Sequence, residues 1–139
     1  MKKILLVVTI SLFFLVVCAC STETPVSTND NTASVAQVQV TFCDMDTKTV
    51  YSAIMKTESP IIIGRYSTSD IVVSDNHVSR THCELVLIDG SLFVKDMDST
   101  NGTYLIKEGE SIKVSEPTEV NVGDVLVLAD VYLVLESIE

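Results

Sequence analysis

The sequence predicts an all-β protein, an antiparallel β-sandwich of about eleven strands preceded by a signal peptide and a flexible linker. After residue 37, apolar residues occur in short runs that are rich in Val, Ile, Leu and Tyr, and turn-forming residues separate these runs. No segment in this part of the sequence keeps a helical apolar period over three turns. A helical fold is therefore excluded.

The predicted strands follow one another at short intervals. In the first, Val38, Val40 and Phe42 alternate with polar residues, which is typical of a half-buried strand. Asp89-Gly90 lies between two later runs, where a two-residue hairpin turn is expected. Ten or eleven strands in about 100 residues favour two packed sheets. The other strands are predicted over 49–55, 61–63, 71–73, 83–88, 92–94, 104–106, 112–114, 125–128 and 131–136.

Length and charge limit the function classes. A chain of 139 residues is long enough for one folded domain. Its formal net charge is −10, and it becomes −12 without Lys2 and Lys3. Nucleic acids and anionic lipid surfaces require a basic footprint, so neither is expected as a partner.

The N-terminus has the organisation of a secretory signal. Lys2 and Lys3 precede an uncharged apolar stretch, Ile4 to Val17, which is shorter than the roughly 20 residues of a spanning helix. The segment Val17-Cys18-Ala19-Cys20 that follows resembles a bacterial lipobox. The resemblance implies cleavage after Ala19 and a lipid on the Cys20 sulfur. An uncleaved membrane anchor is the alternative, and both place the rest of the chain outside the cytoplasm.

These features predict three regions. Residues 1–19 form a lipoprotein-type signal peptide, and residues 20–37 hold the lipidation site and a disordered tether rich in Ser and Thr. Residues 38–137 form the folded domain. The expected location is extracytoplasmic, with a lipid anchor in the cell membrane or the outer envelope.

Three polar loop segments stand at the ends of predicted strands. They are Gly64-Arg65, Ser79-Arg80-Thr81-His82 and Ser99-Thr100-Asn101-Gly102-Thr103. In this order and spacing, and with Gly123-Asp124 before the last hairpin, they resemble the forkhead-associated (FHA) domain. The resemblance covers about Val38 to Glu136.

The resemblance implies an eleven-stranded sandwich that binds phosphothreonine peptides with loops at one end. By position, Arg65 and Ser79 match phosphate ligands, and Arg80 adds charge or a further donor. Thr100 would reach the phosphate or the threonine, and Asn101 would hydrogen-bond the peptide main chain. Guanidinium and hydroxyl groups suit a phosphate with three acceptor oxygens and a charge of about −1.5 to −2.

Other residues of the motifs are expected to be structural. Gly64 and Gly102 would allow backbone angles or close approaches that side chains prevent. In the family pattern, His82 braces the two binding loops by hydrogen bonds. His77 has two open interpretations, a pH-dependent phosphate contact or an exposed loop residue without a role.

The two cysteines of the predicted domain are expected to be free. Strand alternation places Cys43 on the outer face and Cys83 in the core, which gives an exposed and a buried thiol. A disulfide between them is the alternative, since an exported protein can form one.

The predicted function is a non-catalytic, membrane-tethered module that binds phosphothreonine-containing proteins. The alternative is a structural domain that docks an envelope protein independently of phosphate. No catalytic residue, cofactor or metal site is expected, because no Ser–His pair stands in a strand–elbow–helix setting and Cys83 points away from His82. The domain is expected to be monomeric.

Overall fold

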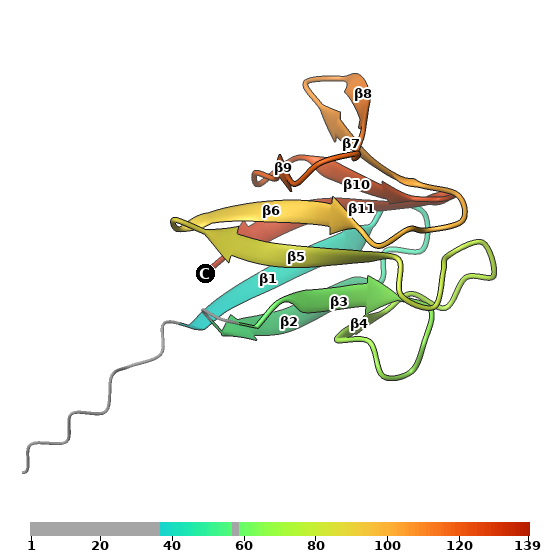
Figure 1. Cartoon of the computed structure of the whole chain (residues 1–139), viewed down its shortest axis with the longest axis horizontal. Coiled ribbons are helices and arrows are strands. Elements are labelled where there is room, and N and C mark those ends of the chain that lie inside the picture. Colours follow the sequence, from blue (N-terminus) through green and yellow to red (C-terminus); the bar gives the residue numbers. More distant parts are fainter. Residues whose placement is uncertain (1–36, 57–58) are drawn as a thin grey trace, which may run out of the picture. The chain divides into compact units, whose positions relative to one another are not determined.

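The computed structural model of the chain describes residues 37–56 and 59–139, which form eleven strands in two sheets (Figure 1). One sheet consists of β1 (Gln37–Asp44), β2 (Val50–Lys56), β7 (Thr103–Lys107), β8 (Glu110–Lys113), β10 (Val125–Leu128) and β11 (Val131–Ile138). Its strand order is β2-β1-β11-β10-β7-β8. The all-β sandwich that the sequence predicts is confirmed.

The second sheet has five strands. They are β3 (Ile61–Gly64), β4 (Ile71–Val72), β5 (Cys83–Ile88), β6 (Ser91–Asp96) and β9 (Thr118–Glu119), in the order β4-β3-β5-β6-β9. Only the short β3–β4 pair is parallel among the pairs between described strands. The fold is thus antiparallel except at one edge.

The predicted signal peptide, Cys20 and the linker up to residue 36 lie outside the described residues. Gln37, predicted as the last linker residue, instead begins β1 and pairs with Lys56. Within 37–56 and 59–139, there is no helix of the length and apolarity needed to span a membrane.

All ten runs named from the sequence are strands. The eleventh strand, β9, was not located, because Thr118-Glu119 is only two residues long and contains no apolar residue. Its register is set by pairing with Phe93 and Val94 of β6. The predicted Asp89-Gly90 turn is confirmed: both residues have positive φ, 51° and 84°, as a type I′ turn requires.

Side chains from both sheets fill the core. On β1, Val40 and Phe42 are fully buried while Thr41 between them is not, as strand alternation requires. Phe42 is one of the largest fully buried side chains. The others of that size class include Met55, Ile61, Ile63, Leu85, Leu105, Leu126, Leu133 and Leu135.

Both cysteines of the domain are free, as expected. Cys83 is fully buried, and burial raises the pKa of its thiol above the ordinary value. Cys43 was predicted to be exposed and is instead half-buried. It lies between Val50 and Val134, its partners on the neighbouring strands, and these side chains share its face of the sheet.

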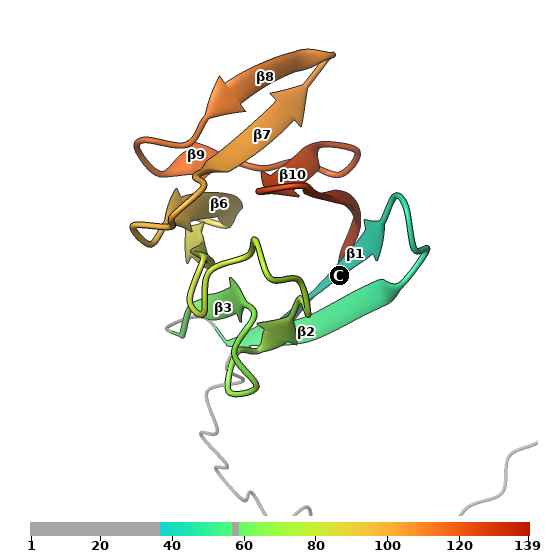
Figure 2. The ribbon, with the colours of Figure 1, turned by 90° about the vertical axis from the view of Figure 1, so that its right-hand side faces the viewer.

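The two ends of the sandwich differ. The chain enters the domain at Gln37 and leaves it at Glu139, and Gln39 and Glu139 are joined by two backbone hydrogen bonds of 2.6 and 2.9 Å. The loops that follow β3, β4 and β6 lie at the opposite end (Figure 1). That end is viewed directly in Figure 2.

Replacing Phe42 with Ala should lower the free energy of unfolding by about 3–5 kcal/mol, because it leaves a cavity where no solvent is admitted. Val50→Ala, at a side chain that is 59% exposed on the neighbouring strand, should change it by less than about 0.5 kcal/mol. Urea unfolding of both variants and the wild type measures the difference. Equal losses would contradict the core described above.

Candidate functional site

Three loops meet because of the strand directions around β3 and β5. The chain leaves β3 at Gly64, and it enters the antiparallel β5 at Cys83, on the same edge of the sheet. β6 runs antiparallel to β5 and ends there too. Loops 65–70, 73–82 and 97–102 therefore gather at one end of the sandwich (Figure 2).

Gly64 allows the first two of these loops to touch. A Cβ atom at this position would lie only 2.2 Å from the carbonyl oxygen of Arg80, which no real side chain permits. Beyond it, the N–H of Arg65 donates to Ser79 O at 2.9 Å and that of Tyr66 donates to Arg80 O at 3.2 Å. Backbone hydrogen bonds between the two loops thus continue beyond the end of the β3–β5 pair.

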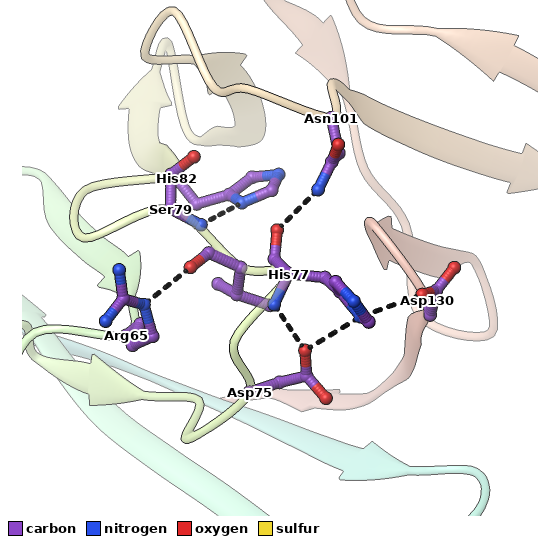
Figure 3. Close-up of polar contacts among 8 residues, drawn as sticks. Arg65, Asp75, His77, Ser79, His82, Asn101 and Asp130 are labelled. Atoms are coloured by element: carbon purple, nitrogen blue, oxygen red, sulfur yellow. Dashed lines mark hydrogen bonds and ion pairs between the residues drawn. The ribbon is translucent and has the colours of Figure 1, made fainter.

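The buried His82 side chain joins the second loop, where it contacts Ser79 (Figure 3), to the third loop. The N–H of Ser79 donates to Nδ1 at 3.0 Å, so Nδ1 carries no proton. Nε2 then donates to the carbonyl of Gly102 at 3.1 Å. This pair of bonds assigns the neutral imidazole, and burial lowers the pKa of His82 below its ordinary value even though the Gly102 carbonyl and Asp96 favour the charged form.

Asp96 shapes the third loop from the end of β6. Its carboxylate accepts hydrogen bonds from the N–H of Ser99 at 3.1 Å, from the Ser99 hydroxyl at 2.6 Å and from the Thr103 hydroxyl. Burial acts to raise the pKa of Asp96, but these hydrogen bonds outweigh it, and the pKa lies below the ordinary value. Asp96, which precedes the loop, is thus bonded both to Ser99 within it and to Thr103 after it.

Four of the residues singled out in the sequence come together. Arg65, Ser79, Arg80 and Thr100 line one cavity of about 570 Å³. Nε of Arg65 donates to Val78 O at 3.0 Å, which orients the guanidinium and leaves its terminal nitrogens available. The Ser79 hydroxyl accepts from the N–H of Thr100 at 3.0 Å, so its own proton remains free for an acceptor.

Asn101 lies beside this cavity and does not line it. Its Nδ2 donates to the carbonyl of His77 at 2.8 Å, which ties the third loop to the second (Figure 3). Its amide oxygen is still an acceptor. Gly102, with φ of 80°, adopts the left-handed backbone that directs its carbonyl to His82.

The imidazole of His77 faces carboxylates and not the cavity. Its Nδ1 lies 3.0 Å from Oδ2 of Asp130, in the turn between β10 and β11, and 3.5 Å from Oδ1 of Asp75. The same Asp75 oxygen accepts the N–H of His77 at 2.7 Å. Of the two interpretations of His77, the structure therefore does not support a phosphate contact.

Several residues at this site were not identified in the sequence. Tyr66 and Asp98 also line the cavity, and their position next to Arg65 and Ser99 was the available signal. Thr81 lines it too, and it was named in the second polar segment without a role. The contact between His77 and Asp130 joins residues more than fifty positions apart, and no motif indicated it. Across residues 37–56 and 59–139, no group of three or more His, Cys, Asp and Glu side chains is arranged to hold a metal ion.

Comparison with known proteins identifies related sequences. The family model of the FHA domain matches residues 61–129, from β3 to the turn after β10. FHA domain-containing protein FhaB of Mycobacterium tuberculosis is 36% identical over 69 residues, which are 48% of this chain and 44% of that protein. An oxoglutarate dehydrogenase inhibitor of Corynebacterium diphtheriae is 44% identical over 61 residues, 43% of each chain. The chain thus spans less than half the length of these relatives.

Solved structures share the fold over more of the chain. One, from a structural and functional analysis of phosphothreonine-dependent FHA domain interactions, is 25% identical with a TM-score of 0.57, and the match covers 71% of this chain and 96% of that one. The FhaA FHA domain, complexed with the intracellular domain of another protein, is 26% identical with a TM-score of 0.56 and coverages of 70% and 99%. These matches cover a larger share of the chain than the family model does.

The buried, neutral His82 predicts a pH-dependent stability. As the pH falls below about 6.5, the unfolded chain takes up a proton that the folded state resists, so the free energy of unfolding should fall. His82→Gln should be less stable at pH 8, by about 1–3 kcal/mol for the lost buried hydrogen bonds, and should lack this part of the pH dependence.

Urea unfolding of both proteins between pH 8 and pH 5.5 tests this expectation. The chain contains only two histidines, and the contribution of His77 cancels in the difference between wild type and variant. Parallel curves over this pH range would contradict the role of His82.

Proposed function

We propose that the chain contains an FHA domain and that this domain is a non-catalytic interaction module, which binds phosphothreonine-bearing peptides in the cavity between its loops. The observation that carries the proposal is the distribution of charge. From residue 37 onward there are 7 basic side chains against 17 acidic ones. Two of the seven, Arg65 and Arg80, line this one cavity.

The groups in the cavity suit a phosphate. Arg65 presents a guanidinium whose orientation is set by its bond to Val78 O, and Ser79 presents a hydroxyl proton. A phosphothreonine brings about −1.5 to −2 charge and three acceptor oxygens, which these donors satisfy by charge-assisted hydrogen bonds. Arg80 adds positive charge, and Thr100 contacts the phosphate or the threonine.

Asn101 would hold the peptide itself. It stands next to the cavity, its Nδ2 is used within the protein, and its amide oxygen can accept a main-chain N–H. Gly64, His82 and Gly102 keep the loops at the required separation and do not touch the ligand. The FHA domain structure from the work on phosphothreonine-dependent interactions supports this assignment by similarity.

Arg65→Ala and Ser79→Ala should each weaken binding of a phosphothreonine peptide. The loss of hydrogen bonds to a charged group, about 1.5–3 kcal/mol, corresponds to at least tenfold in Kd for Arg65→Ala. Lys95→Ala is the matched control, because it removes one positive charge from β6, where Lys95 pairs with Glu84 at 3.1 Å outside the cavity. Fluorescence anisotropy at low salt measures the three affinities.

Wild-type protein that binds no phosphothreonine peptide at low salt would overturn this function. Docking of an envelope protein independently of phosphate would then be the remaining candidate. A loss in Lys95→Ala equal to that in Arg65→Ala would show that only the overall charge matters.

We also propose that the domain is lipid-anchored outside the cytoplasm through Cys20. The support is the lipobox-like Val17-Cys18-Ala19-Cys20 after an apolar stretch that carries no charge. The position of Gln37 at the end remote from the loops agrees with it, because an N-terminal anchor there leaves the cavity free (Figure 1). Both proposals together require a phosphothreonine on the outer side of the membrane.

Cys20→Ser should abolish incorporation of a radiolabelled fatty acid into the protein and leave the precursor uncleaved. Cys18→Ser should have neither effect, since Val17 before it is too large for the lipobox-like pattern. Labelled protein in the Cys20→Ser variant, or normal cleavage of that variant, would refute lipidation at this residue.

A further inference from the structure

The cavity proposed to hold the phosphate also contains a carboxylate. Asp98, in the loop between β6 and β7, lines it together with Arg65 and Arg80. It is exposed, and within the described part of the chain no Lys, Arg or His forms an ion pair with it. Its charge is therefore available to a bound molecule.

The charges in the cavity do not balance with a phosphate alone. Two guanidinium groups, the Asp98 carboxylate and a phosphothreonine of about −1.5 to −2 leave an excess of negative charge, and the phosphate is brought close to a like charge. A positive charge on the ligand near the phosphate removes both problems, because it pairs with Asp98.

We propose that Asp98 is a specificity-determining residue that selects phosphothreonine peptides with a basic side chain close to the phosphothreonine. This inference rests on the proposed phosphopeptide function and narrows the class of ligand. It assigns the cavity two parts, with Arg65, Ser79, Arg80 and Thr100 for the phosphate and Asp98 for a cation.

Tyr66 gives independent support for a cationic group on the ligand. Its side chain lines the same cavity and is 53% exposed, which is high for a large aromatic residue. The face of a tyrosine ring attracts a guanidinium or an ammonium group. Arg is expected to be preferred to Lys, because it can stack on a ring and also pair with a carboxylate.

The backbone at Asp98 permits a clean substitution. Its φ is 52°, in the left-handed region that Asp and Asn tolerate better than other side chains, so Asp98→Asn removes the charge without new strain. Asp89 provides a matched control. It is also exposed and has a φ of 51°, but it lies in the β5–β6 turn at the other end of the sandwich (Figure 1).

The experiment uses phosphothreonine peptides in which each flanking position in turn holds Arg, Ala or Glu, and it measures Kd by fluorescence anisotropy. At one or more positions, the wild type should bind the Arg peptide about twofold to fivefold more tightly than the Ala peptide. Asp98→Asn should lose this preference and still bind the Ala peptide. Asp89→Asn should keep the preference, which excludes an effect of net charge.

The outcomes separate the two proposals. Wild-type binding with no preference for Arg at any position, or a preference that persists in Asp98→Asn, would overturn the role of Asp98 and leave the phosphopeptide function intact. Equal loss in Asp89→Asn would overturn it as well. No binding of any phosphothreonine peptide would overturn the function and, with it, the selection by Asp98.

Discussion

The site depends on one uncharged imidazole. Nδ1 of His82 accepts a hydrogen bond from the backbone N–H of Ser79, and Nε2 donates one to the Gly102 carbonyl. Ser79 and Gly102 belong to two loops that are otherwise joined at only a few points. A second proton on the ring would place a donor against the Ser79 N–H and break the bridge. Burial opposes this second protonation, because it makes the charged form of the ring unfavourable. The burial of His82 thus also determines its protonation state.

In contrast to the uncharged, buried His82, the surface of the domain carries many charged side chains. The folded domain is strongly acidic, and its loop end combines two arginines with Asp98 in one cavity. Asp75 and Asp130 both lie close to Nδ1 of His77. The two arginines thus offer positive charge to an anionic ligand inside the cavity, whereas the net negative charge of the domain opposes the approach of such a ligand.

Much of the fold could be read from the sequence because strand alternation is a local property. Phe42 and Thr41 take opposite faces for reasons that involve their neighbours alone, whereas β9 exists because of pairing with β6 and carries no pattern of its own. The residues of the candidate site show the same difference between local and long-range signals. Arg65 and Ser79 stand in recognisable motifs. The contact of His77 with Asp130, however, depends on the position of a distant turn. The position of Asp98 in the cavity depends on its own left-handed backbone conformation. Long-range geometry of this kind leaves no local signal.

The two backbone hydrogen bonds between Gln39 and Glu139 bring the ends of the folded domain side by side, far from its loops. A host protein could therefore accept the whole sandwich within one of its surface turns, since the inserted unit would begin and finish at nearly the same point. The loops would project outward from such an insertion. The end of the domain that joins the rest of a chain and the end that carries the loops can therefore be altered separately.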